Sequence, residues 1–307
     1  PLLSPARQRL FAQIRETISA NQAQRRPSVG YHDYYASTRE LVLTLMTQGE
    51  HPVYLDQLAR LGDDLVGHSA AVAHLALLLG IRLRGYLVEQ RKRLAPSHAS
   101  EVVNLGVGGM LHDMGKLKLP ADQQGRTIVD AATDPAYQAH CEQGYELIRH
   151  GVEPSAAAAV LHHHQRWDGA GFPAMKRAIA PDPADAARGV TTRYVHEPRS
   201  GSRIHVFARV LYAADLFDRI ANFSGRAKRE NFEALALLRA RYAGAMDPVV
   251  HRTLEEVASA FPPGTHLTLS DGSAAVLIAP DPADTFRPIV RQVVDGVARE
   301  QSPNPLS

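Results

Sequence analysis

Apolar residues recur every three to four positions along most of this 307-residue chain, which predicts amphipathic helices. Leu10, Ile14 and Ile18 share one face of a predicted helix over residues 5–21, and a second helix is expected over 35–48. The same periodicity predicts helices over residues 61–95 (one or two), 99–116, 135–150, 154–164, 204–222, 229–243 and 247–260. The pattern therefore favours an all-α fold.

Two segments depart from the helical period. Residues 173–203 are rich in Pro, Asp, Gly and Arg, and their length suggests a mobile insertion or lid. After Phe261 the pattern predicts a β-hairpin that turns at residues 270–273, whereas residues 287–299 are ambiguous. We therefore expect an N-terminal helical lead-in (1–60), a catalytic domain (61–260, with the insertion 173–203) and a C-terminal β-hairpin and tail (261–307).

Composition narrows the class of protein only slightly. The formal net charge of +2 is no signature of a DNA- or RNA-binding protein. With Cys141 as the single cysteine, no intrachain disulfide can form. The chain contains no run of eighteen apolar residues, and its first residues lack a signal-peptide pattern. The expectation is a cytoplasmic protein with no polymeric nucleic-acid partner and no membrane partner.

Histidines and aspartates stand next to one another inside apolar helical sequence. His112-Asp113 is one such pair, and three successive histidines occupy positions 162–164. Imidazole together with carboxylate favours Fe or Mn over a structural zinc, which prefers cysteine. Asp64 and His68 are four residues apart and can point into the same pocket. Ligands from several helices suggest a site with more than one ion, at which a shared carboxylate and an activated water could cleave a phosphoester.

Four sequence segments carry a family resemblance. Leu111-His-Asp-Met-Gly-Lys-Leu-Lys-Leu-Pro120 resembles the first signature of the HD-domain metal-dependent phosphohydrolases. His140-Cys-Glu-Gln-Gly, His163-His-Gln-Arg-Trp-Asp-Gly-Ala-Gly-Phe-Pro173 and Ala213-Ala-Asp-Leu-Phe-Asp218 resemble, in the expected order, later motifs of the HD-GYP subfamily. The likeness extends over about residues 60–275 and is specific because the motifs occur together and in order.

The resemblance implies an HD-domain helical bundle that hydrolyses the bacterial second messenger cyclic di-GMP to pGpG, GMP or both. Catalysis would use a hydroxide that bridges two or three divalent ions, most simply Fe or Mn. Asp113 would bridge the ions, and Asp64 stands where some members have a glutamate for a third ion. The implied ligands are Asp64, His68, His112, Asp113, His140, His163, His164 and Asp215.

The resemblance also implies substrate contacts. Lys116 would contact the scissile phosphate and serve catalysis together with Asp113, while Arg226, Lys228 and Arg229 would grip the nucleotide. Phe172 stands where the subfamily has the tyrosine of Gly-Tyr-Pro, so the ring is kept and the hydroxyl is lost. The subfamily's glutamate after the two histidines is Gln165 here. These departures bear on substrate and turnover more than on metal binding.

Other interpretations stay open on the sequence alone. The chain could hydrolyse another nucleotide, or it could be a low-turnover cyclic di-GMP receptor or scaffold, for which Phe172 and Gln165 are the motive. His162 is expected to face away from the ions, because three successive helical residues cannot converge. Asp218 could orient a ligand histidine. The N-terminal helices could serve dimerisation or bind a signalling partner.

Overall fold

The computed structural model describes residues 8–9, 12–16, 19, 31–47, 65–120, 133–189, 191–222, 229–261, 264–279, 281, 284–294 and 297–300. The α-helices are α2 (Tyr31–Thr47), α4 (Leu65–Arg82), α5 (Arg84–Gln90), α6 (Pro96–Ala99), α7 (Val103–Leu111), α10 (Pro135–Ile148), α11 (Pro154–His162), α12 (Pro183–Ala187), α13 (Val206–Ala221), α14 (Asn231–Tyr242) and α15 (Pro248–Ala258). Three 3₁₀ helices accompany them: η2 (Met114–Lys118), η3 (Gly201–Arg203) and η4 (Ala243–Ala245).

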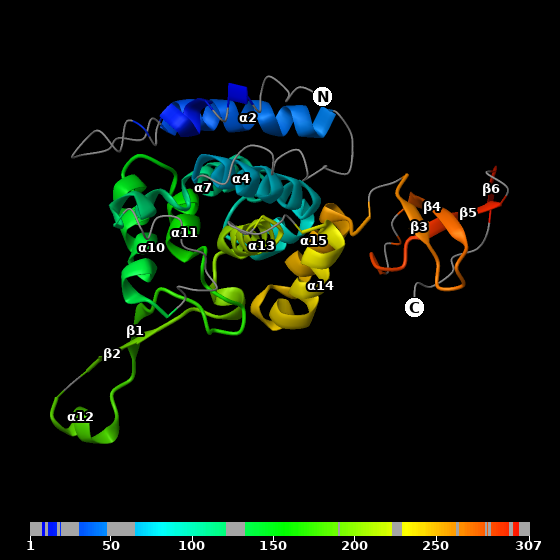
Figure 1. Ribbon diagram of the computed structural model, residues 1–307. Coiled ribbons are helices and arrows are strands. Elements are labelled where there is room, and N and C mark those ends of the chain that lie inside the picture. Colours follow the sequence, from blue (N-terminus) through cyan, green and yellow to red (C-terminus); the bar gives the residue numbers. More distant parts are fainter. Residues whose placement is uncertain are drawn as a thin grey trace.

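Helices α4, α7 and α13 form the centre of the bundle, and α2 lies along α4 and α7 (Figure 1). Among the described helices α4 alone is long and apolar enough to cross a membrane, but 72% of it is buried inside the protein. Its apolar residues, such as Leu75, Leu77 and Leu79, belong to the main hydrophobic core. Burial in the core is therefore the reason for its composition, and the predicted all-α class is confirmed.

The predicted helices match the observed ones apart from their ends. The segment 61–95 divides into α4 and α5 within its described part, and 99–116 divides into α6, α7 and η2. In the segment 5–21 the described residues are helical, and Ile14 is buried in the core. Residues 48–64 lie outside the described part of the chain, so the domain boundary expected at residue 60 stays a prediction.

Two helices end earlier than the sequence pattern predicts. α7 ends at Leu111 and α11 at His162, so His112-Asp113 and His163-His164 lie at the turns that follow. The prediction of helix through residues 116 and 164 was wrong because the apolar period continues into these turns, where the side chains stay buried although the helix has ended. In the turn after α11 the rings of His163 and His164 lie close together, with their centres 4.0 Å apart.

Gly115 brings the turn after α7 against α10. A β-carbon at this position would lie 1.9 Å from the backbone oxygen of His140 and 2.6 Å from the nitrogen of Gly144. Because these neighbours are backbone atoms, no side-chain adjustment could make room for one. The glycines of the two motifs thus let the segment of Asp113 and Lys116 pack directly on the helix of His140.

The described residues of the insertion 173–203 form a hairpin, whose strands the sequence pattern did not predict, and the role of a mobile lid stays a prediction. Strands β1 (Met175–Ile179) and β2 (Arg193–Glu197) pair antiparallel, with Met175 opposite Glu197 and Ile179 opposite Arg193. α12 lies at the tip, and the hairpin projects from the bundle (Figure 1). The residues alternate too weakly in hydrophobicity to signal a strand, because neither face of the ribbon is covered.

The C-terminal segment forms a four-stranded antiparallel sheet, more than the single hairpin predicted. Its strands, in order, are β3 (His266–Thr268), β4 (Ala274–Ala279), β5 (Ile289–Val294) and β6 (Val297–Glu300). The predicted turn at 270–273 joins β3 to β4, and the ambiguous segment 287–299 contains β5 and most of β6. The sheet has a small core of its own, formed by Leu269, Ala275 and Val290.

Candidate metal centre

Two groups of possible metal ligands meet inside the bundle. We call His68, His112, Asp113 and Asp215 the first group, and His140, Cys141, His163 and His164 the second group. Within each group the ligand atoms lie within 4.8 Å of one another. Except for His68, which is partly exposed, every member is buried. Helices α4, α10 and α13 and the turns after α7 and α11 supply them, so residues up to 147 positions apart in sequence converge.

The imidazoles of both groups present lone pairs to one another. The Nδ1 atoms of His112 and His163 lie 2.7 and 2.6 Å from the backbone oxygens of Gly109 and Val160, and that of His140 contacts the oxygen of Tyr137. A carbonyl oxygen only accepts, so each Nδ1 donates, and the neutral form of each ring has its lone pair at Nε2. Burial opposes protonation of His112, but Asp113 and Asp215 raise its pKa, so this ring offers the lone pair once it loses its second proton. This is the arrangement of a metal-binding histidine fixed by its other nitrogen.

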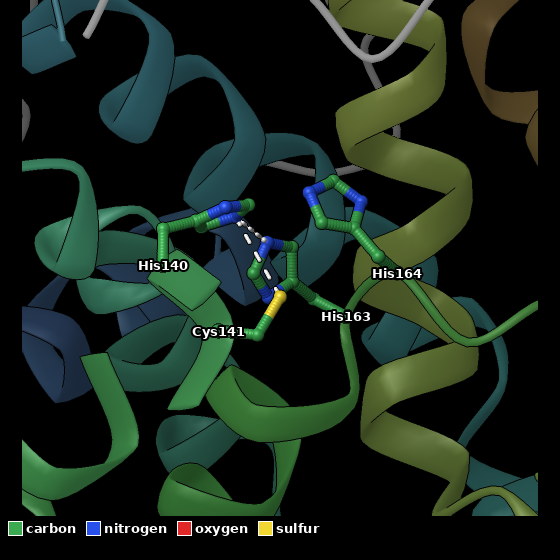
Figure 2. A group of neighbouring side chains, drawn as sticks. All are labelled: His140, Cys141, His163 and His164. Carbon is green, nitrogen blue, oxygen red and sulfur yellow. Dashed lines mark hydrogen bonds between the residues drawn. The ribbon is translucent and has the colours of Figure 1, made fainter. Parts of the chain in front are cut away.

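In the second group His140 is in contact with both His163 and Cys141 (Figure 2). The Nε2 atoms of His140 and His163 are 3.3 Å apart, and Cys141 Sγ lies 3.6 Å from His140 Nε2. Bond lengths of about 2.0 Å to nitrogen and about 2.3 Å to sulfur give ligand separations of roughly 3.3 and 3.5 Å around a tetrahedral ion. Two lone pairs at this distance repel unless a proton or a metal ion lies between them.

Several buried polar atoms of the two ligand groups have no hydrogen-bond partner among the described residues. They are Asp113 Oδ1, Asp215 Oδ2 and both ring nitrogens of His164. Asp113 Oδ1 lies 3.5 and 3.7 Å from the Nε2 atoms of His140 and His163, and Asp215 Oδ2 lies 3.8 Å from His164 Nδ1. Buried polar groups seldom stay unpaired. The donor set therefore fits a divalent metal ion at the second group.

Asp113 joins the two groups. Its Oδ1 faces the second group, whereas its Oδ2 lies 3.4 Å from His112 Nε2 and 3.5 Å from His68 Nε2 in the first group. His68 is itself held by Asp218, whose Oδ2 is 2.7 Å from His68 Nδ1. The side chain of Asp218 therefore orients a histidine of the first group, the role that the sequence left open.

Comparison with known proteins agrees with this geometry. The profile of the HD domain family matches residues 65–220, which make up half of the chain and contain both ligand groups. The chain belongs to the HD domain family. HD domain phosphohydrolases bind divalent metal ions, and the His and Asp groups described above fit that property.

Two relatives sharpen the comparison. A cyclic di-GMP phosphodiesterase of Pseudomonas aeruginosa is 26% identical over 239 residues, which cover 74% of this chain and 48% of the relative. The chain thus spans about half the length of that protein. An HDG"Y"P protein from Bdellovibrio bacteriovorus has a similar structure, with a TM-score of 0.53 and 14% identity over 82% of this chain and 70% of that one. The latter similarity concerns the fold alone.

The pKa values of the histidines differ between the two ligand groups, which together we call the HD site. In the second group burial lowers the pKa of His140 to about 3, and it also lowers the pKa of His163 and His164. In the first group burial and Arg219 would lower the pKa of His68, but hydrogen bonds with Asp113, Asp215 and Asp218 raise it to about 10. The second group therefore holds neutral imidazoles, the form that binds metal.

Arg219 is a member of the HD site that the sequence analysis did not identify. Its Nε lies 2.7 Å from Asp215 Oδ1 and its Nη2 lies 2.8 Å from Asp113 Oδ2. Burial alone would raise the pKa of Asp215, yet Arg219 with His112 and His68 holds that pKa well below the usual range. The spacing of four residues after Asp215 on a helix was the available signal.

Lys116 also lies in the site, beside the carboxylate that joins the groups. Its Nζ is 2.7 Å from Asp113 Oδ2 and 5.2 Å from the centre of the Tyr137 ring. Burial, with the neighbouring charge of Arg219, lowers the pKa of Lys116. The charges of Lys116, His112 and Arg219 outweigh burial at Asp113 and keep its pKa well below the usual range.

Cys141 and Phe172 line the second group. Cys141 directly follows His140 in sequence and is fully buried, and burial raises the pKa of its thiol. Cys141 was not among the ligands expected from the sequence, although it directly follows His140, a predicted ligand. Phe172 is 7% exposed, and its ring packs against that of His164 at a tilt of 40°, with 4.6 Å between the ring centres. Its contacts are therefore with the ligand imidazoles, and a contact with substrate stays a prediction.

The remaining predicted residues divide into described and undescribed ones. Asp64, Arg226 and Lys228 lie outside the described residues. Arg229 is described, and its guanidinium donates to the backbone oxygen of Ile220 at 2.6 Å, near the end of α13. His162 is buried but belongs to neither ligand group.

Proposed function

We propose that this HD domain is a metal-dependent phosphodiesterase that hydrolyses cyclic di-GMP to linear pGpG, GMP or both. The observation that carries the proposal is the convergence of the two ligand groups on Asp113, with the ammonium of Lys116 against the same carboxylate. The relative named as a cyclic di-GMP phosphodiesterase supports the choice of substrate. Fe or Mn is proposed as the metal because histidine and carboxylate ligands predominate.

When bound, the metal would lower the pKa of a water molecule and polarise a phosphate oxygen. The residues that would hold it are His140, His163 and His164, with Asp113 Oδ1 and Asp215 Oδ2. His140 and His163 are held in the required orientation by hydrogen bonds to backbone oxygens of their own turns. Because these imidazoles are already oriented, they lose less conformational entropy when the metal binds than mobile side chains would.

The scissile phosphate would lie beside Lys116 and the metal. In the transition state negative charge builds on the phosphate oxygens, and a fixed ammonium stabilises it. Arg226, Lys228 and Arg229 are proposed to bind the nucleotide further out, and Phe172 is proposed to lie at the substrate side of the second group. We also propose that the protein acts in the cytoplasm, and that its N-terminal helices bind a second copy or a signalling partner.

An anaerobic purification followed by metal analysis and a substrate panel tests the function. The protein is incubated with Mn(II) or Fe(II) and with cyclic di-GMP, cyclic di-AMP, linear pGpG or 2′,3′-cyclic AMP at equal metal loading. Hydrolysis of cyclic di-GMP with the highest kcat/KM supports the proposal. A higher kcat/KM for another nucleotide would assign a different substrate, and tight binding of cyclic di-GMP with metal but without turnover would indicate a receptor.

A further inference from the structure

The two ligand groups do not offer a metal ion the same atoms. Asp113 Oδ2 accepts from Lys116 Nζ at 2.7 Å and from Arg219 Nη2 at 2.8 Å. Asp215 Oδ1 lies 2.7 Å from Arg219 Nε and 2.9 Å from His68 Nε2. A carboxylate oxygen accepts along two lone-pair directions. Both oxygens that face the first group are therefore already used by protein donors.

The oxygens left over point the other way. Asp113 Oδ1 and Asp215 Oδ2 have no partner among the described residues. Their nearest ligand nitrogens belong to His140, His163 and His164, at 3.5 to 3.8 Å. Each aspartate thus gives one oxygen to a guanidinium and keeps the other for the second group.

The guanidinium itself stands where a cation of the first group would bind. Arg219 spans Asp113 and Asp215 with two adjacent N–H groups, and its side chain is only 10% exposed. A divalent ion bound by the same two oxygens would lie against this charge in a site of low dielectric, where like charges repel strongly. Arginine does not lose its proton at any physiological pH, so the conflict cannot be relieved by deprotonation.

We propose that the guanidinium of Arg219 takes the place of a metal ion in the first group, so that the chain holds one divalent ion, in the second group. Asp113 then bridges a metal ion and an arginine rather than two metal ions. The guanidinium supplies positive charge beside the phosphate, as arginine does in phosphoryl-transfer enzymes. This inference concerns the metal centre of the proposed phosphodiesterase and does not depend on which nucleotide it cleaves.

Counting bound Mn(II) tests the inference without substrate. The chelated full chain is dialysed against excess Mn(II), metal is quantified by mass spectrometry, and electron paramagnetic resonance reports whether the ions are isolated or coupled. The wild type is expected to bind about one equivalent with the hyperfine pattern of an isolated ion, whereas ions sharing a bridging carboxylate would be coupled. About two coupled equivalents in the wild type would overturn the inference.

Substitution of Arg219 gives the second arm. Arg219→Ala frees two carboxylate oxygens and is expected to double the Mn(II) stoichiometry and to introduce coupling. Arg177→Ala, which removes an exposed arginine paired with Glu197, is the matched control and should stay at one equivalent. A stoichiometry of one in folded Arg219→Ala would contradict the inference. If that variant folds poorly without metal, Arg219→Gln keeps a polar side chain without the positive charge, and it should also gain an ion.

The outcomes separate this inference from the proposed function. One ion without hydrolysis of any nucleotide would sink the phosphodiesterase and leave the role of Arg219 standing. Two coupled ions together with hydrolysis of cyclic di-GMP would contradict the role of Arg219 and support the phosphodiesterase.

Discussion

Helix α13 carries the buried Arg209 and the largely buried Arg219, and their surroundings differ. Arg209 donates to Asp247 Oδ2 at 2.6 Å, to Tyr86 and Gln90 at 2.8 Å, and to the backbone oxygen of Ile204 at 3.0 Å. The other oxygen of Asp247 caps α15 by accepting from Val249 N at 2.9 Å. This cluster has one positive and one negative charge, and both carboxylate oxygens are paired.

The second arginine, Arg219, lies in an incomplete cluster. It contacts two carboxylates, and each of these keeps one oxygen without a partner among the described residues. We call the Arg209 cluster closed, because both oxygens of its carboxylate are paired, and the Arg219 cluster open, because each of its carboxylates keeps one oxygen without a hydrogen bond. A closed ion pair holds helices together, whereas the remaining oxygens of an open one can bind a ligand. A buried Arg–Asp pair alone therefore does not identify a functional site. The carboxylate oxygens that do not contact the arginine, and that lack a hydrogen bond, do identify one.

The largest effect is expected at Asp113, the shared carboxylate of the open cluster. Asp113→Ala should remove the metal and reduce hydrolysis by roughly a thousandfold or more, because the metal supplies several kcal/mol of transition-state stabilisation. Metal content and kcat are the measurements, with Asp271→Ala in the exposed β3–β4 turn as control. Full metal content in Asp113→Ala would show that the ligand assignment is wrong.

At the closed cluster the effect should fall on stability instead. Arg209→Met leaves Asp247 buried without its cation and should lower the free energy of unfolding by about 3–5 kcal/mol. Metal stoichiometry per folded chain should not change. Urea unfolding measures the loss, and Arg177→Ala, at an exposed pair, should lower the free energy of unfolding far less. An equal loss of unfolding free energy in the two variants would show that burial of the Arg209–Asp247 pair does not add to its contribution to stability.

Lys116 tests whether the open cluster acts on the phosphate. Lys116→Met should retain metal and lower kcat by about 10²–10³-fold, the usual effect of losing one donor that stabilises transition-state charge. Lys118→Met, two residues later in η2 and exposed, should be unaffected. A Lys116→Met protein that binds no metal would show a structural role for the ammonium rather than a catalytic one.

The smallest effect concerns His205, which caps α13 at the end nearest Arg209. Its Nδ1 accepts from Phe207 N at 3.3 Å. Burial, with Arg91 and Arg209, lowers its pKa to about 4. The unfolded state, with a pKa near 6.5, then binds more protons between pH 6.5 and 4, so stability should fall as the pH falls through this window, by at most about 3 kcal/mol.

His205→Asn keeps a capping acceptor but does not titrate. Urea midpoints measured from pH 7 to pH 4 should therefore change less steeply in this variant than in the wild type. Parallel curves would exclude His205 as the source of the acid sensitivity.

Much of the fold and most of the ligand groups followed from the sequence, because helical period and motif order are local signals. The ends of α7 and α11 did not follow, since buried histidines continue the apolar pattern past the last helical turn. The β1–β2 hairpin was missed because its two faces are exposed. Arg219 was missed because its partner Asp113 is 106 positions away, a contact that only the packing of α13 beside the turn after α7 creates.

Gln165 connects the metal centre to the projecting hairpin. Its Nε2 donates to the backbone oxygen of Pro173 at 2.5 Å, and its Oε1 accepts from the backbone nitrogen of Arg199 at 2.7 Å. One side chain thus closes the insertion at both of its roots, one residue after His164. We therefore expect that the length and sequence of the segment between Pro173 and Arg199 can change without moving His164, provided that the amide at position 165 is kept.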